Sequence, residues 1–136
     1  MKNRRQFLKE SSALGAASFL APSIYAGTAA GASELEVGVL FSLSGGLAMI
    51  EKSLSDATLM AIDEINAAGG VNGMMIKPIL EDGASDPKTY NEKASKLVIR
   101  DRVPTVFGSY TSASRKAVLP VFEKRNNMYF LSLIHI

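Results

Sequence analysis

The chain has 136 residues, of which 47% are hydrophobic and 21% are charged, and its formal net charge is +2. This composition is that of an ordinary globular protein with one modest core. The sequence contains no cysteine, which excludes disulfides, thiolate metal sites, cysteine nucleophiles and a lipidated cysteine anchor.

The first 26 residues have the pattern of an export signal. The segment starts with the basic residues Lys2, Arg4, Arg5 and Lys9. An apolar stretch over about residues 11–21 follows and is too short to span a bilayer. Small residues then offer cleavage sites between positions 26 and 32. The run "NRRQFLK" resembles a twin-arginine signal, which implies a periplasmic or secreted product.

Removal of this segment changes the charge. The remaining chain keeps eleven basic and twelve acidic residues, a net charge of −1. A nucleic-acid partner then loses its main electrostatic support, so we expect none. We expect residues 27–33 to be a flexible lead and residues 34–130 to be the folded part. The last six residues, 131–136 ("LSLIHI"), match a frame translation of a transposase sequencing adapter, so we expect them to be an artefact.

In residues 34–130, short apolar runs typical of strands alternate with segments whose apolar residues have the spacing of helices. Apolar runs predict strands at about residues 35–41, 75–81, 103–108 and 128–130. Between them, spacing of three and four residues predicts a helix over 53–68, whose inner face is Leu54, Ala57, Ala61, Ile62, Ile65 and Ala68. Asp56, Asp63 and Glu64 face outward. This helix ends at two glycines, Gly69 and Gly70.

Two more helices are expected. One begins at Pro87 after the capping residue Asp86, and its apolar stripe is Tyr90, Ala94, Leu97 and Val98. The other spans 111–126, where Pro120 is expected to kink or divide it. The order β-α-β-α-β-α-β predicts an α/β fold with a parallel, doubly wound sheet covered by helices on both faces.

In such a sheet, ligands bind at the carboxyl ends of the strands, where the strand order reverses. Two polar loops follow strands there, "SLSGG" after the first and "GSYTS" after the third, and "EDGASD" after the second is a weaker candidate. Five hydroxyl residues lie in and after the "GSYTS" loop: Ser109, Tyr110, Thr111, Ser112 and Ser114. Thr111 or Ser112 is expected to cap the helix, which leaves the other hydroxyls free to bind a small polar molecule.

The sequence contains little that indicates a catalytic site or a metal site. A serine hydrolase needs a base beside its nucleophile, and the only histidine, His135, lies in the doubtful final segment. The chain has no phosphate-binding glycine motif, and Glu81, Asp82 and Asp86 lack the spacing of a calcium loop. We therefore expect no catalytic residue, no metal and no cofactor.

Several segments together resemble a known family. "VGVLFSLSGG", "LMAIDEINAAGGVNG", "ASDPKTYNEKASKLV" and "VFGSYTSASRKAVLPVFE" are similar, in this order, to the amino-terminal lobe of branched-chain-amino-acid-type solute-binding proteins of ABC transporters. "TSASRKAVLPVFEKRN" is closer to the subgroup that binds urea and short-chain amides. The resemblance implies a type I periplasmic-binding-protein fold, of which 34–130 is a partial amino-terminal lobe. It also implies two lobes that close on a ligand and then dock on an inner-membrane permease.

The resemblance assigns ligand contact to particular positions. Tyr110 and Ser112 would meet the ligand, with Thr111 beside them, and Ser44 and Gly45 would line the cleft from the loop after the first strand. The cargo would be urea or a short-chain amide, or alternatively a branched-chain or other amino acid. A related fold also serves in amide-responsive regulators, a different class of function, but an export signal argues against a cytoplasmic sensor.

Overall fold

The computed structural model describes residues 33–132. The expected export signal, almost all of the expected lead and residues 133–136 of the expected adapter segment lie outside this range. The strands are β1 (Glu34–Phe41), β2 (Met75–Asp82), β3 (Thr105–Gly108) and β4 (Met128–Leu131). The helices are α2 (Ala48–Ala67), α3 (Pro87–Ser95) with the π-helical turn η2 (Lys96–Arg100), and α4 (Ser112–Arg125).

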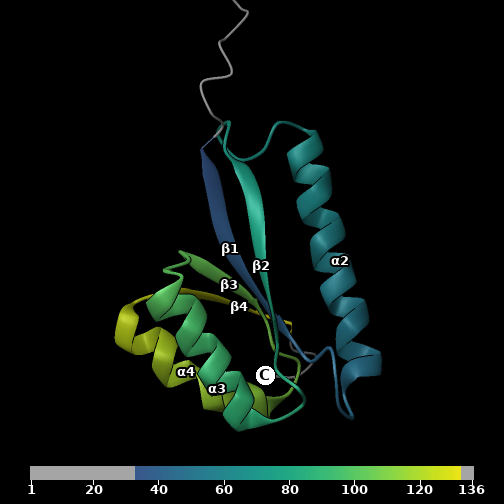
Figure 1. The fold of residues 1–136 in the computed structure, drawn as a ribbon, viewed down its shortest axis with the longest axis vertical. Helices are drawn as coiled ribbons and strands as arrows, with labels where there is room; N and C mark the ends of the chain where they lie inside the picture. Colours follow the sequence, from purple (N-terminus) through teal and green to yellow (C-terminus); the bar gives the residue numbers. More distant parts are fainter. Residues whose placement is uncertain (1–32, 133–136) are drawn as a thin grey trace, which may run out of the picture. The chain divides into compact units, whose positions relative to one another are not determined.

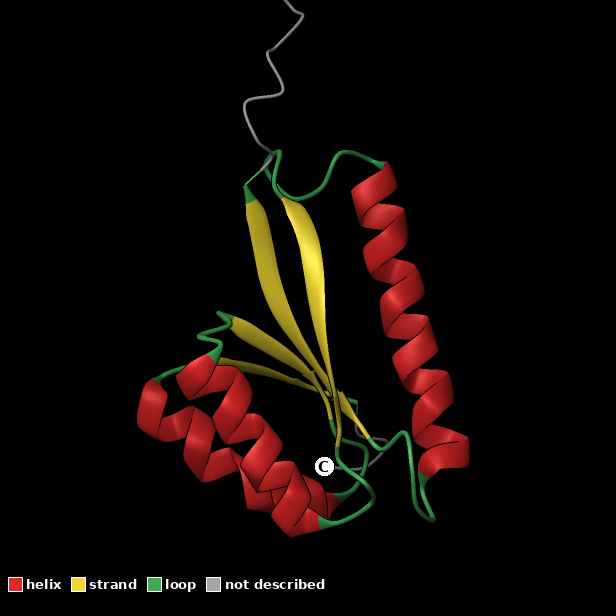
Figure 2. Ribbon diagram, in the orientation of Figure 1, coloured by secondary structure: helices red, strands yellow, loops and turns green. Residues whose placement is uncertain are grey.

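The four strands form one parallel sheet in the order β2-β1-β3-β4. In Figure 1, α2 lies on one side of this sheet, and α3 and α4 lie together on the other. Figure 2 shows the same alternation of strands and helices by colour. The sequence therefore predicted the fold class, the chain order of the elements and the two-sided covering of the sheet correctly.

The core has two halves, one on each side of the sheet. On the α3 and α4 side, Leu40 and Val106 of the strands pack against the helices, and the buried helical residues include all four of the predicted stripe, Tyr90, Ala94, Leu97 and Val98. On the α2 side, the cluster is smaller: Val37, Val39, Phe41 and Ile62. The alternation along β1 sends successive side chains to the two halves, as expected for a strand buried on both faces.

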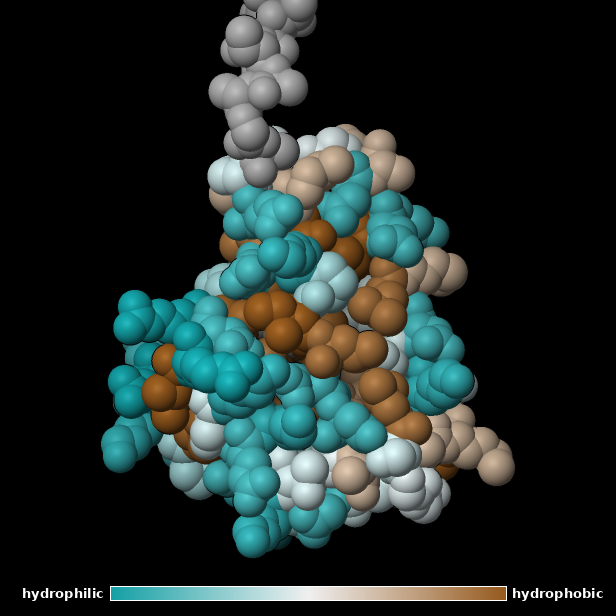
Figure 3. Space-filling model, in the orientation of Figure 1, coloured by the Kyte–Doolittle hydropathy of each residue, from teal (hydrophilic) through white to brown (hydrophobic). Residues whose placement is uncertain are grey.

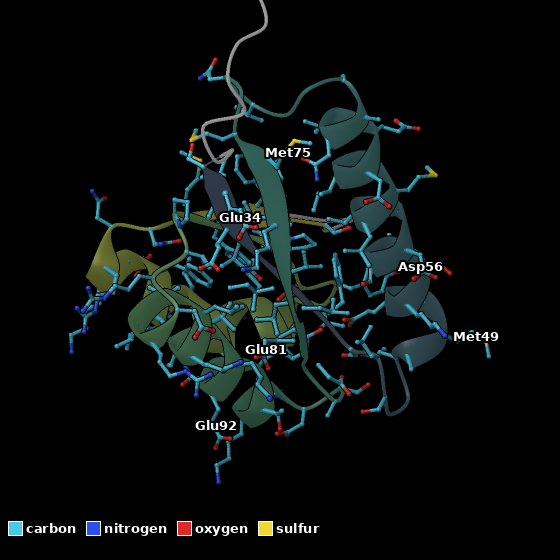
Figure 4. The ribbon with its side chains drawn as sticks, turned by 45° about the horizontal axis from the view of Figure 1, so that its top comes forward. Glu34, Met49, Asp56, Met75, Glu81 and Glu92 are labelled. Atoms are coloured by element: carbon cyan, nitrogen blue, oxygen red, sulfur yellow. The ribbon has the colours of Figure 1, made fainter. Side chains whose placement is uncertain are left out.

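Helix α2 begins five residues before the predicted start and buries a face that is partly polar. Its buried residues are Glu51, Ser55 and Ile62, while Asp56, Asp63 and Glu64 are exposed as predicted. Of the predicted inner face only Ile62 is buried and Leu54 half-buried. Ala57, Ala61, Ile65 and Ala68 are exposed, against the prediction, and the first three line a groove beside the sheet. Figure 4 shows Met49 and Asp56 on the side of α2 that faces away from the sheet.

Of the two outcomes expected at Pro120, a kink or a division of the last helix, division is wrong, since α4 is continuous from Ser112 to Arg125. Proline removes the hydrogen bond to the carbonyl four residues earlier, which here belongs to Lys116. Both Pro120 and Lys116 are exposed, so water can satisfy that carbonyl. The other boundaries agree within about two residues, and Asp86 caps α3 by accepting a hydrogen bond from the Thr89 N–H.

Strand β2 forms one edge of the sheet and carries charged residues along its α3 side. Lys77 pairs with Glu34 and Glu36 of β1 at 3.0 and 3.3 Å. The buried Glu81 pairs with Lys93 of α3 at 2.8 Å and with Lys96 of η2. Pro78 lies between these charges, opposite Val37. Figure 4 shows Glu81 on the α3 side of the sheet.

Candidate functional site

Three loops meet at the carboxyl edge of the sheet. After β1 the chain passes through α2 to β2 on one side, and after β2 it passes through α3 to β3 on the other side of β1. The strand order therefore reverses between β1 and β3, which is where ligands bind in open α/β sheets. The polar loops predicted as candidates follow β1, β2 and β3, and they lie together at this position.

Asp82, the last residue of β2, fixes the loop that follows β1. Its Oδ1 accepts hydrogen bonds from the N–H groups of Leu43 at 2.8 Å, Ser44 at 3.3 Å and Ala84 at 2.8 Å. Its Oδ2 accepts from the Ser44 hydroxyl at 2.7 Å. Partial burial raises the pKa of Asp82, but these hydrogen bonds outweigh it and hold the pKa below its usual range.

Ser85 joins the same two loops a second time. Its hydroxyl donates to the Ser44 carbonyl at 2.9 Å and accepts from the Leu47 N–H at 3.0 Å. Its own N–H donates to the Ser42 hydroxyl at 3.0 Å. Gly45 lies against it with φ +81°, and a Cβ at this position would come within 2.7 Å of the Ser85 hydroxyl. The loops after β1 and β2 therefore form one cross-linked unit that requires glycine at position 45.

The loop after β3 packs directly on the backbone of β1. The Ser109 N–H donates to the Leu40 carbonyl at 2.9 Å, and a Cβ on Gly108 would lie 2.0 Å from that carbonyl oxygen. The Thr111 hydroxyl caps α4 by accepting from the Ser114 N–H at 3.1 Å. Of the two predicted capping residues, Thr111 is therefore the cap.

A small cavity of about 210 Å³ lies where the three loops meet, and we call it the loop pocket. Its lining comes from the loop after β1, from the start of α3 and from the start of α4: Leu47, Ser85, Pro87, Tyr90, Thr111, Ala113 and Ser114. No charged side chain lines it. Four of these residues carry hydroxyls, so the loop pocket suits a small polar molecule held by hydrogen bonds.

A larger cavity of about 600 Å³ lies elsewhere, and we call it the apolar groove. It runs between α2 and the sheet, and its lining includes Leu35, Leu54, Ile65 and Phe107 but no charged residue. Figure 3 shows hydrophobic side chains gathered across the middle of the molecule in this view, beside α2. Three hydroxyl residues, Thr58, Thr105 and Ser132, stand among its apolar side chains, and the groove lies away from the carboxyl edge of the sheet, so it is the poorer candidate for a polar ligand despite its size.

The predicted site residues are at this edge but not all in the loop pocket. Thr111 lines it, whereas Tyr110 and Ser112 are its neighbours in sequence, half-buried and exposed respectively. Ser44 and Gly45 are exposed in the loop after β1. The Ser44 hydroxyl already donates a hydrogen bond to Asp82.

Sequence reasoning missed Ser85, Tyr90 and Glu51 as site residues. The sequence pattern predicts Tyr90 only as part of an apolar stripe. In the structure its hydroxyl forms hydrogen bonds with both Ser42 and Glu51. Burial, followed by the hydrogen bond to Glu51, raises the pKa of the Tyr90 hydroxyl above its usual range. Glu51 fell outside the predicted helix. Its spacing from Ser55 and Ile62 on one helix face was the signal available.

Within residues 33–132, no group of three or more potential metal ligands is found. No helix in this same range is long and apolar enough to cross a membrane.

Comparisons with known proteins identify relatives of this chain. A family model described as "Periplasmic binding protein domain" matches residues 35–135. "Leu/Ile/Val-binding protein homolog 8" of Brucella suis is 36% identical over 118 residues, which are 86% of this chain and 28% of the relative. "Leu/Ile/Val-binding protein homolog 7" of Brucella abortus is 31% identical over 79% of this chain and 27% of its own length.

A solved structure agrees with these matches. The branched-chain amino acid transporter substrate-binding protein LivJ from Streptococcus pneumoniae, in complex with isoleucine, aligns with a TM-score of 0.73 and 28% identity. The alignment covers 76% of this chain and 30% of that structure. The chain thus spans less than a third of the length of the relatives it matches.

Proposed function

Because this chain belongs to the periplasmic binding protein family, with the type I fold, we propose that it captures a small polar solute in the periplasm for an ABC importer. The observation that carries the proposal is the loop pocket, an uncharged cavity with four hydroxyl residues in its lining, at the point where the strand order reverses. The protein performs no chemistry in this role. It holds the solute and presents it to a permease in the inner membrane.

We propose urea or a short-chain amide as the solute. Neutral hydroxyls dominate the polar lining of the loop pocket, and the first N–H groups of α4 have no partner within the helix. Hydroxyl oxygens can meet an amide N–H, and helix N–H groups can meet its carbonyl oxygen. An amide needs no charged partner, which agrees with the lining.

A branched-chain or other amino acid is the alternative solute. It is favoured by the relatives, which carry the name "Leu/Ile/Val-binding protein homolog", and by the isoleucine complex of the similar LivJ structure. An amino acid needs a partner for its ammonium group, and no acidic side chain lines the loop pocket. An amino acid therefore requires an acidic partner that this lining does not supply.

We further propose that Tyr110 and Ser112 contact the solute, with Thr111 beside them and Ser44 and Gly45 at the rim. Tyr110 offers an aromatic wall with a polar tip. Ser112 is exposed on the first turn of α4, next to the loop pocket. Ser44 and Gly45 are held in place by Asp82 and Ser85, so they shape the rim more than they offer free hydrogen-bonding groups.

The test uses the longest open reading frame that contains this chain in its source DNA. The purified product is titrated calorimetrically with urea, acetamide, formamide and leucine. Saturable binding of urea or an amide supports the proposal. Binding of leucine alone would show instead that the solute is an amino acid. Ser112→Ala should weaken binding about tenfold or more, because it removes a solute hydrogen bond. Ser53→Ala is the matched control, an exposed serine of α2 away from the loops. No binding of any of these solutes would contradict the proposed function.

A further inference from the structure

Charge is distributed unevenly over the described residues. From Lys88 to Arg125, the part of the chain that contains α3, η2, β3 and α4, there are nine basic and three acidic residues, a net charge of +6. The rest of residues 33–132 has two basic and nine acidic residues, a net charge of −7. Figure 1 shows α3 and α4 together on one side of the sheet. That side is therefore the basic one, and a basic face favours anionic partners.

Only part of this basic charge is neutralised within the fold. Lys93 and Lys96 pair with the buried Glu81, and Arg100 pairs with Asp101 at 3.1 Å. Four other basic residues are exposed and form no ion pair with a described residue: Arg102, Lys116, Lys124 and Arg125. These four compensate no acidic group of residues 33–132, so their charge is available to a partner.

A groove of about 270 Å³ lies beside two of these cations, and we call it the basic groove. One wall comes from the end of α3 and from η2, and the other comes from the second half of α4. The lining residues are Ser95, Ile99, Pro120, Val121, Lys124 and Arg125. Within each wall they are spaced by four residues, which places them on one face of their helix. No acidic side chain lines the basic groove, since Glu123 of α4 is not part of its lining.

The apolar residues of the basic groove are open to solvent. Ile99 is 48% exposed, Pro120 is exposed and Val121 is half-buried. Figure 3 shows a small hydrophobic area at α4 with hydrophilic side chains around it. Protein interfaces have this arrangement, an apolar centre that a partner covers and a polar rim that surrounds it.

The backbone is irregular in both walls of the basic groove. The turn η2 is π-helical, and the Asp101 N–H donates to the Lys96 carbonyl at 3.0 Å, five residues earlier. Such turns are rare and occur frequently at functional sites. In the other wall, Pro120 has no N–H to donate to the Lys116 carbonyl. Both walls therefore depart from regular α-helical hydrogen bonding at the groove.

Helix stability alone accounts for only part of these features. Lys124 and Arg125 lie in the last turn of α4, where cations interact favourably with the helix dipole. That effect requires neither an exposed Ile99 nor an apolar groove beside the two cations. It also leaves the exposed Arg102 unexplained, because this residue lies outside the helices.

We propose that the basic groove binds an acidic segment of a partner protein. An apolar side chain of that segment contacts Ile99 and Val121, and Asp or Glu residues on either side of it pair with Lys124 and Arg125. The charge complementarity carries the choice of partner, because the groove combines two cations with no acidic side chain. An anionic membrane fits less well, since the apolar residues line a groove between two helices and do not form a continuous apolar helix face.

The experiment uses the product of the full reading frame and a fluorescein-labelled peptide in which one leucine is flanked on both sides by aspartates. Fluorescence anisotropy should show saturable binding that weakens as salt is added, because exposed charges are screened. Replacement of the aspartates by asparagine, or of the leucine by serine, should weaken binding about tenfold or more. Absence of binding, or equal binding of the three peptides, would overturn the proposal.

Two pairs of variants locate the site of binding. Lys124→Glu should weaken peptide binding about tenfold, whereas Lys52→Glu, the same charge change at an exposed position of α2, should leave it unchanged. Ile99→Ser should also weaken binding, and Met60→Ser, at a residue of α2 that is 60% exposed, should not. Equal effects within either pair would refute the assignment to the basic groove. Arg125→Glu serves in place of Lys124→Glu if that variant does not fold.

Two further measurements test other occupants of the basic groove. Binding to phosphatidylglycerol vesicles that Lys124→Glu abolishes, with no peptide binding, would overturn the proposal in favour of a membrane surface. Self-association in sedimentation velocity that Lys124→Glu abolishes would overturn it in favour of a second copy of the chain. Solute affinity should be the same in Lys124→Glu and in the wild type, so a failure of this proposal leaves the proposed function intact.

Discussion

Asp82 at the end of β2 and Ser44 in the loop after β1 form a two-point contact: the carboxylate accepts hydrogen bonds from the Ser44 N–H at 3.3 Å and from the Ser44 hydroxyl at 2.7 Å. The same carboxylate also accepts the N–H groups of Leu43 and Ala84. One side chain at the end of β2 thus holds the loop after β1 in place.

Asp82→Asn should lower the free energy of unfolding by about 1–3 kcal/mol, because an amide nitrogen replaces one acceptor and leaves donors of the loop unpaired. Urea unfolding followed by circular dichroism measures this loss. Asp63→Asn on the exposed face of α2 is the matched control and should change stability by less than about 0.5 kcal/mol. Equal stability of the two variants would show that the loop does not need the charge.

Acid should destabilise the protein through Asp82 and Glu81. Burial raises the pKa of each carboxyl, but hydrogen bonds from Ser44 and the loop to Asp82, and from Lys93 and Lys96 to Glu81, leave both pKa values below their usual range. A carboxyl with a lowered pKa in the folded state stabilises the fold above the pKa of the unfolded chain, about 4, and loses that contribution as the pH falls through the folded value.

The melting temperature should therefore be nearly constant from about pH 7 to pH 5 and fall below about pH 4. Asp82→Asn should flatten part of this fall. A wild-type melting temperature that rises on acidification below pH 4 would be incompatible with lowered pKa values of Asp82 and Glu81 in the folded state.

Gly108→Ala should be strongly destabilising, since the added Cβ would lie 2.0 Å from the Leu40 carbonyl oxygen. The backbone of β3 must then move away from β1, at a cost of about 1–3 kcal/mol or more. Gly46→Ala is the control, because a Cβ there meets nothing within 4 Å. Thermal unfolding of the two variants side by side tests the prediction, and a neutral Gly108→Ala would mean that the two strands are farther apart.

Thr111→Ala should cost about 1 kcal/mol, because it removes the cap of α4. Thr111→Ser retains the hydroxyl and should recover most of the loss. If Thr111→Ala and Thr111→Ser have the same melting temperature, the hydroxyl does not cap the helix. Since Thr111 also lines the loop pocket, solute affinity is measured in parallel to separate the two effects.

We propose export by the twin-arginine route, directed by the signal in residues 1–26, with cleavage between positions 26 and 32. A fusion of this segment to a fluorescent protein that folds before export should reach the periplasm of a bacterial host. Replacement of Arg4 and Arg5 by lysine should leave the fusion in the cytoplasm. Periplasmic fluorescence that persists in the lysine variant would exclude this route.

Much of the fold follows from local patterns in the sequence. The stripe Tyr90, Ala94, Leu97 and Val98 is fully buried as predicted, and the Asp86 cap is confirmed, because hydrophobic period and capping are properties of neighbouring residues. The start of α2 was misplaced, since Glu51 and Ser55 are polar residues on its buried face and break the hydrophobic period.

The details of the site could be predicted less well. Loop positions at strand ends follow from the chain order, so the sequence placed Thr111 and its neighbours at the correct edge of the sheet. The bonds from Asp82 to Ser44 and from Glu51 to Tyr90 join residues 38 and 39 positions apart. No periodicity connects such residues, and their pairing follows only from the strand order β2-β1-β3 and the packing of α2 and α3 on opposite sides.

The two edges of the sheet differ in their capacity to accept another strand. At the β2 edge, Pro78 lacks an N–H to donate, and the neighbouring Lys77 adds a charge, both of which discourage strand addition. At the β4 edge, Met128, Phe130 and Leu131 are exposed and neither proline nor charge interrupts the strand. Of the two edges, the β4 edge is therefore the one whose side chains do not discourage a further strand.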